Sequence, residues 1–94
     1  MNTLLSSAAA ARSVSQAVAF VRPRLERTEA IGDRLRTLWA AVAAARNMAA
    51  EEIVEGEFLK LAFDTGLAAE LGRHADHDLR HVIRWAILNQ NPFQ

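Results

Sequence analysis

Residues 31–49 read IGDRLRTLWAAVAAARNMA, and their apolar side chains follow one another at intervals of four, three, four, three and four residues. This spacing places them on one face of an α-helix and is typical of a helix that packs against a neighbour. Trp39 falls at the edge of that face. We expect the opposite, polar face to be solvated and the helix to extend from Arg24 or Thr28 to Arg46. The apolar positions are Ile31, Leu35, Leu38, Val42, Ala45 and Ala49; the polar ones are Glu26, Glu29, Asp33, Arg36 and Thr37.

A helix is also predicted upstream, from Thr3 to Val21, because apolar residues again recur every three or four positions. Pro23 has no amide hydrogen and disfavours the helical conformation at Arg22, so we expect it to end this helix or to restart the chain. The two apolar stripes together predict an antiparallel helical hairpin with close, alanine-rich packing. The upstream stripe consists of Leu4, Ala8, Ala11, Val14, Val18 and Val21.

The next part of the chain predicts a third helix followed by a short helical turn. Asn47 is the expected N-cap, because its amide can accept a hydrogen bond from the first turn. Gly66 is the expected stop, because glycine adopts the left-handed conformation at low cost. A short turn from Leu67 to Leu71 then ends at Gly72. The first turn of the third helix holds Glu51 and Glu52, and its inward stripe is Val54, Phe58, Leu61 and Ala62.

The last helix is predicted from Ala75 to Asn89, with Pro92 as its stop. Arg80 and Arg84 follow Asp76 and Asp78, in the order that the helix dipole prefers. The core face consists of Leu79, Val82, Ile83, Ala86 and Ile87.

Composition supports this helical interpretation. The chain has 94 residues, of which 19 are alanine and 51% are hydrophobic. Alanine has the highest helix propensity, and the β-branched residues never alternate with polar ones over the length of a strand. We therefore expect residues 1–94 to form a single all-α domain: a compact bundle of about four helices, with the short extra turn between helices three and four.

The charges argue against several classes of protein. Eleven basic and eleven acidic residues cancel, which argues against a polybasic nucleic-acid or membrane binder. The absence of cysteine excludes disulfides and thiolate metal ligands, and no apolar run is long enough to span a membrane.

The charges are unevenly distributed along the chain: residues 1–50 carry a net +4 and residues 51–94 a net −4. We expect the two halves to complement each other, within one fold or between subunits, the alternative being that the arginine-rich segment 22–36 contacts an acidic partner. The ten-to-one ratio of arginine to lysine favours a bacterial origin, and we expect a cytoplasmic protein.

All three histidines lie within eight residues, in the run from His74 through His77 to His81. On one helix, these three and Asp78 would share a face. Imidazoles and a carboxylate suit zinc or another divalent metal, but a closed site would need ligands from elsewhere. The alternatives are a polar flank beside the core and a contact surface that continues through Trp85 and Leu88.

Residues 58–75 can also be compared with a helix-turn-helix. Ala62 and Gly66 have a suitable four-residue separation. However, Arg73 is the main basic residue of the would-be reading helix, and acidic neighbours would face the phosphates. A small DNA-binding regulator and a metal-binding protein thus remain alternative functions.

The leading expectation is a non-enzymatic interaction module, such as a small regulator, inhibitor or assembly factor. The sequence contains no nucleophile elbow, Walker loop, glycine-rich dinucleotide loop or His-Glu-x-x-His motif, so we expect no enzyme activity. We expect a protein partner, a homodimer or both, because the apolar residues exceed what one small core covers. The interface candidates are His77, His81, Trp85, Leu88, Leu59 and Phe63, with Phe93 adding to the surplus.

Overall fold

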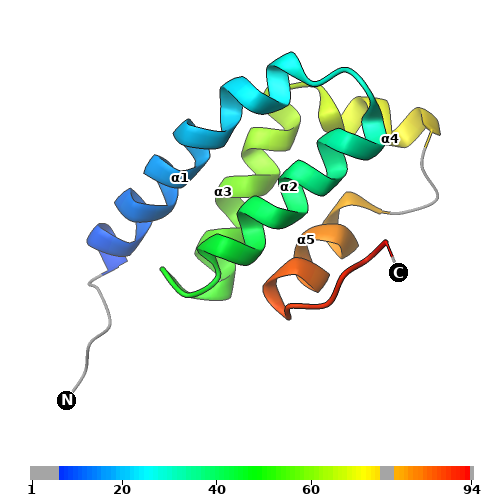
Figure 1. Cartoon of the computed structure of the whole chain (residues 1–94). Helices are drawn as coiled ribbons and strands as arrows, with labels where there is room; N and C mark the ends of the chain where they lie inside the picture. Colours follow the sequence, from blue (N-terminus) through cyan, green and yellow to red (C-terminus); the bar gives the residue numbers. More distant parts are fainter. Residues whose placement is uncertain (1–6, 75–77, 94) are drawn as a thin grey trace.

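A computed structural model describes residues 7–74 and 78–93, and these residues are all-α (Figure 1). They contain a long first helix of 21 residues, two helices of 15 and 14 residues, and two short helices of eight and nine residues at the end. The helices are α1 (Ser7–Arg27), α2 (Ile31–Ala45), α3 (Glu51–Asp64), α4 (Leu67–His74) and α5 (Leu79–Ile87).

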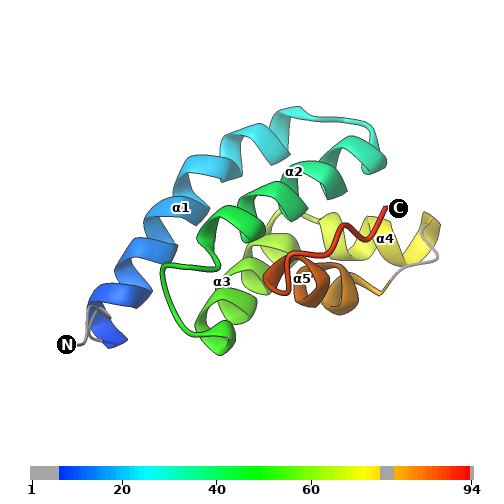
Figure 2. The same cartoon turned by 60° about the horizontal axis from the view of Figure 1, so that its bottom comes forward.

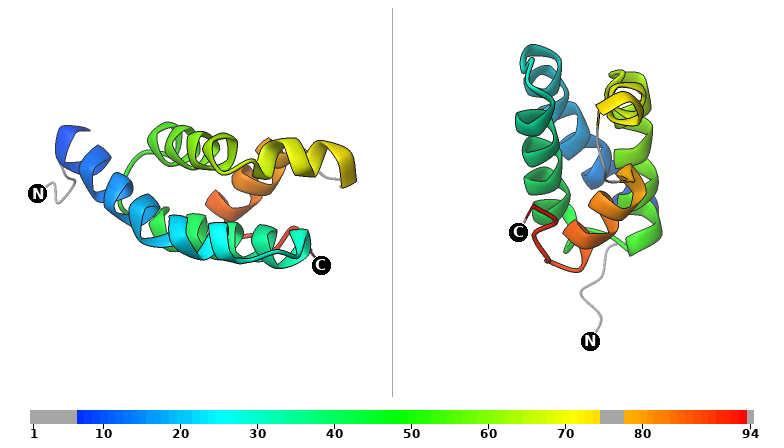
Figure 3. Two further views of the ribbon diagram at one scale, coloured as in Figure 1. Left: turned by 90° about the horizontal axis from the view of Figure 1, so that it is seen from above. Right: turned by 90° about the vertical axis from the view of Figure 1, so that its right-hand side faces the viewer.

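The helices form two layers. α1 and α2 pack against each other as an antiparallel pair, and α3 and α4 lie in the second layer (Figure 3). α5 contacts both α2 and α3, so it joins the two layers. The Cα atoms extend over 45 × 25 × 15 Å, which makes the molecule a slab with the α1–α2 pair along one broad side. None of the helices in the described ranges combines the length and the apolar character needed to cross a lipid bilayer.

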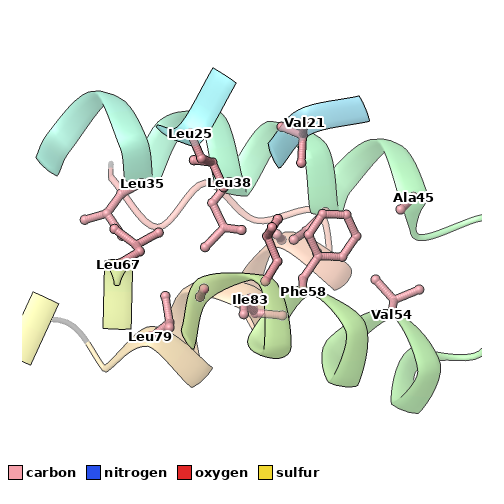
Figure 4. Close-up of a cluster of buried hydrophobic side chains, with 14 of the residues drawn as sticks. Val21, Leu25, Leu35, Leu38, Ala45, Val54, Phe58, Leu67, Leu79 and Ile83 are labelled. Carbon is pink, nitrogen blue, oxygen red and sulfur yellow. The ribbon is translucent and has the colours of Figure 1, made fainter. Parts of the chain in front are cut away.

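The core lies between the layers and is formed by the predicted stripes (Figure 4). Leu38 of α2, Phe58 of α3 and Ile83 of α5 are fully buried there. The ends of the α2 stripe, Ile31 and Ala49, are half-buried and pack against the same cluster. The predicted hairpin and the inward faces of α3 and α5 are therefore confirmed.

In the α1 stripe, Val14 and Val21 are buried as predicted, but Ala8 is exposed and Ala10 is buried in its place. Leu4 and the predicted helix start at Thr3 lie outside the described residues.

Pro23 does not end the first helix, which was predicted to stop near Val21. α1 continues through Pro23 to Arg27. Pro23 has no amide hydrogen to donate to the carbonyl of Ala19, and both residues are exposed. The extra turn carries Leu25 into the core, where it is fully buried. Burial of a leucine stabilises by about 1.5–3 kcal/mol, comparable to the cost of about 3 kcal/mol for an interior proline.

Two helix starts also differ from the prediction. Residues 24–27 belong to α1, so α2 begins only at Ile31. Asn47 is not the N-cap of α3, because the chain makes a turn after α2 and Ala50 takes the cap position without a side-chain hydrogen bond. Periodicity predicts that a helix is present, but it does not fix the residue at which the preceding turn ends and the helix begins.

The region around the predicted last helix differs most. α4 does not stop at Gly72 but continues to His74, and α5 begins at Leu79 rather than at Ala75. Its N-cap is Asp78, whose Oδ1 accepts a hydrogen bond from the amide of Arg80 at 2.9 Å. α5 ends at Ile87, two residues before the predicted Asn89. Gly66 does take the left-handed conformation, at φ 78°, as predicted.

Ion pairs join the basic first half to the acidic second half. Arg22 of α1 meets Asp64 of α3 at 3.5 Å. Arg34 of α2 meets Glu70 of α4 at 2.6 Å. The prediction that the two halves complement each other within one fold is confirmed for these pairs.

Candidate protein-binding surface

The structure does not place the predicted histidine cluster on one helix. His74 is the last residue of α4, whereas His81 lies in the first turn of α5. Asp78 lies between the two helices, and its carboxylate caps α5. His77 lies outside the described residues. The described residues hold no group of three or more histidine, aspartate or glutamate side chains that could bind a metal, and the zinc hypothesis stays a prediction.

His81 and Trp85 form a contact of their own on α5. Their rings stack with centroids 6.1 Å apart and planes inclined by 19°. His81 is exposed and Trp85 is half-buried. Leu88, at the C-cap of α5, is 59% exposed. This part of the predicted contact surface is therefore at the surface of the bundle.

The other predicted interface residues do not continue this surface as one patch. Leu59 packs against the core cluster. Phe63 is 69% exposed, but it lies near the end of α3. Leu88 borders a small cleft with Glu52, near the start of α3. Since Glu52 and Phe63 are eleven residues apart, their Cα atoms are separated by roughly 16 Å along the helix axis.

The C-terminal segment covers part of the apolar surplus. It turns back from α5 toward α2 (Figure 2), where the indole Nε1 of Trp39 donates a hydrogen bond to the carbonyl of Gln90 at 3.0 Å. Pro92 is buried, and Phe93 packs against the core cluster. Phe93 therefore belongs to the fold, and the expectation that it adds to an uncovered surplus is wrong.

An apolar hollow lies elsewhere, between α1 and α2. It is an open groove of about 660 Å³. Phe20 is one of its lining residues and is 87% exposed, and Met48, also in the lining, is 38% exposed. Small side chains make up most of the remaining lining, which consists of Ala17, Val21, Arg24, Arg36, Thr37, Ala40, Ala41 and Ala44.

The charged side chains in this lining are both arginines. Arg24 and Arg36 lie toward the same end of the groove, because the C-terminal part of α1 runs beside the N-terminal part of α2. Arg36 pairs with Asp33 at 3.4 Å, and its guanidinium lies 5.6 Å from the centre of the Phe93 ring. Both side chains of that ion pair are about two-thirds exposed, so the pair itself is weak.

Sequence reasoning missed Phe20 and Met48. The apolar stripe of α1 contains Val14, Val21 and Leu25, and Phe20 lies off that stripe. A large aromatic residue on the polar face of an amphipathic helix is the signal that could have identified it. The alanines of the lining carried no such signal, because alanine is common at every kind of helical position.

The helix-turn-helix comparison covers α3, the turn at Thr65 and Gly66, and α4. In α4, the Glu70 carboxylate points at Arg34 of α2 and is three-quarters buried. Arg73 is exposed. One exposed arginine on the reading helix can make few contacts with a DNA phosphate backbone. DNA binding stays an alternative prediction.

No protein-family model, curated protein sequence or solved structure significantly matches this chain.

Proposed function

We propose that this chain is a non-enzymatic helical interaction module that binds a protein partner through the groove between α1 and α2. The observation that carries this proposal is Phe20, an aromatic residue left 87% exposed in the lining of an apolar hollow. Exposed apolar surface of this kind is typical of protein-binding sites on small soluble domains.

The free energy of burying an aromatic ring favours contact between Phe20 and a partner protein. Complete burial of a phenylalanine gains about 1.5–3 kcal/mol, and in this fold Phe20 contributes little of it. A partner that covered the ring would recover that free energy at the interface. Aromatic residues beside a hollow are the usual energetic centres of such interfaces.

The chemistry of the lining supports binding over catalysis. Its polar side chains are Arg24, Arg36 and Thr37, and the other lining side chains are apolar. An arginine stays protonated and does not serve as a general base, and a threonine needs an adjacent base to act as a nucleophile. The groove thus provides a concave apolar surface and positive charge, which suit binding.

Site-specific photocrosslinking in the native host tests the proposal. A benzoylphenylalanine replaces Phe20 in one variant and Phe63 in a second, since Phe63 is also an exposed phenylalanine but lies on α3, away from the groove. We expect a discrete crosslinked protein from the Phe20 position. Crosslinks from Phe63 alone would instead favour the α3 surface predicted from the sequence, and no crosslink from either position would contradict the proposal.

A further inference from the structure

We infer that the groove between α1 and α2 accepts an amphipathic α-helix of a partner protein, with carboxylates of that helix against Arg24 and Arg36. This inference rests on the proposed function and adds the secondary structure and the charge of the partner.

The spacing of the lining residues fits a helix. Lining positions recur every three or four residues on both walls, from Ala17 to Arg24 on α1 and from Arg36 to Ala44 on α2. Arg36 and Ala44 are separated by roughly 12 Å along the axis, or about two helical turns. Side chains at such intervals form the ridges and grooves into which a neighbouring helix packs. Alanines on the floor allow that helix to approach closely.

The backbone of the groove argues against an extended peptide. The lining residues other than Met48 lie within α1 and α2, where backbone groups bond within the helix. The amide of Met48 donates to the carbonyl of Ala45 at 2.9 Å. An extended peptide would find few partners for its own N–H and C=O groups, whereas a helix satisfies most of them internally.

The arginines determine the charge of the occupant. Within the described part of the chain, the Arg24 guanidinium forms no ion pair, and Arg36 has only its exposed pair with Asp33. The Arg36 guanidinium also lies 5.6 Å from the centre of the Phe93 ring, and Phe93 is not a lining residue of the groove. Carboxylates in the first turn of a partner helix would meet both arginines and would also be favoured by the dipole of their own helix.

The same charges disfavour a second copy of this chain as the occupant. Residues 1–50, which include α1 and α2, carry a net +4. Asp64 and Glu70 offset two of these arginines through Arg22 and Arg34, but both of those pairs face α3 and α4 rather than the groove. A copy docked face to face would bring positive side chains against positive side chains.

The test uses the full chain and a fluorescently labelled synthetic helix. The probe is a side-chain-stapled peptide of about 18 residues, long enough to remain helical once stapled. Leucine and alanine recur every three or four positions, glutamine fills the other positions, and two glutamates occupy the first turn. A second peptide carries two lysines in place of the glutamates, and a third has the composition of the first but no apolar stripe. Fluorescence anisotropy measures each dissociation constant at low and at physiological salt.

We expect micromolar binding of the glutamate peptide and at least tenfold weaker binding of the other two. Phe20→Glu should raise the dissociation constant for the glutamate peptide at least tenfold. The matched variant Phe63→Glu should leave that dissociation constant unchanged. The double variant Arg24→Glu and Arg36→Glu should reverse the preference toward the lysine peptide, more strongly at low salt. Circular dichroism of each variant checks that its helices remain formed.

Three results would overturn the inference. Equal binding of the three peptides would remove both the requirement for an apolar stripe and the requirement for negative charge. If the glutamate peptide does not bind but crosslinks at Phe20 still form in the host, the proposed function holds. The inference that the partner is an acidic helix is then wrong. A sedimenting dimer that Phe20→Glu dissociates and Phe63→Glu does not would show that a second copy covers the groove.

Discussion

The Arg34 guanidinium of α2 joins two helices of the other layer at once. Its Nη1 donates to the Glu70 carboxylate of α4 at 2.6 Å, and its Nη2 donates to the carbonyl of Thr65 at the end of α3 at 3.0 Å. The Arg34 side chain is only 12% exposed. This arginine therefore fixes the joint between α3 and α4 against the α1–α2 layer.

Loss of that joint should destabilise the fold. We expect Arg34→Met to lower the free energy of unfolding by about 1–3 kcal/mol, because it leaves the Glu70 carboxylate and the Thr65 carbonyl without their donor. Urea unfolding followed by circular dichroism measures this. Arg12→Met, at an exposed position of α1, is the matched control and should change stability by less than about 0.5 kcal/mol. Equal effects of the two substitutions would show that the joint contributes nothing.

The α2 stripe should dominate the core energetics. Leu38 is fully buried, so Leu38→Ala should cost about 2–5 kcal/mol through lost burial and the cavity left behind. Arg36→Ala, on the exposed side of the same helix, should cost less than about 1 kcal/mol. Thermal unfolding of both variants provides the comparison. A Leu38→Ala protein as stable as the parent chain would be incompatible with this core.

Two glycines should respond to alanine with opposite signs. Gly66 has φ 78°, so Gly66→Ala should destabilise the protein by about 1 kcal/mol. Gly56 lies inside α3, and a Cβ there would meet no atom within 4 Å. Gly56→Ala should therefore stabilise by about 0.5–1 kcal/mol. Melting temperatures of the pair test both signs, and a shared sign would contradict the conformation assigned to one of them.

Pro23 should be a position where substitution improves stability. Pro23→Ala restores an amide that can donate to the carbonyl of Ala19 in a helix that already continues past this point. A gain of about 1–2 kcal/mol is expected, since part of the proline penalty is offset by the stiffness that proline gives the unfolded chain. Chemical denaturation measures it, with Gln16→Ala on the same helix as control. A less stable Pro23→Ala protein would argue that the proline fits this helix better than its chemistry predicts.

The cap of α5 provides the most local prediction. Asp78→Ala removes the acceptor for the Arg80 amide and should destabilise by about 1 kcal/mol. Asp78→Asn retains a cap oxygen and should stay within about 0.5 kcal/mol of the parent chain. Hydrogen exchange of the first-turn amides of α5 reports the effect directly. Faster exchange in both variants would show that the carboxylate charge, and not the cap oxygen, holds this helix end.

The interior of this protein could be predicted from the sequence because each helix carries its own apolar stripe. The spacing from Ile31 to Ala45 is a property of a single helix, and so are the stripes around Phe58 and Ile83. A helix must bury such a stripe wherever it packs, so the all-α class and most core residues follow from periodicity alone. Gly66 was predictable for the same reason, since its conformation is decided within one turn.

Tertiary structure decided the features that depend on two segments at once. Pro23 stays helical because Leu25 beyond it finds a place in the core, and that place is built by other helices. Phe93 is covered because the C-terminal segment turns back onto the bundle. The groove beside Phe20 exists only where the alanines of α2 face α1, so neither helix alone indicates it. Local spacing determines which side chains each helix must bury, but contacts between distant segments determine which ones are left at the surface for a partner.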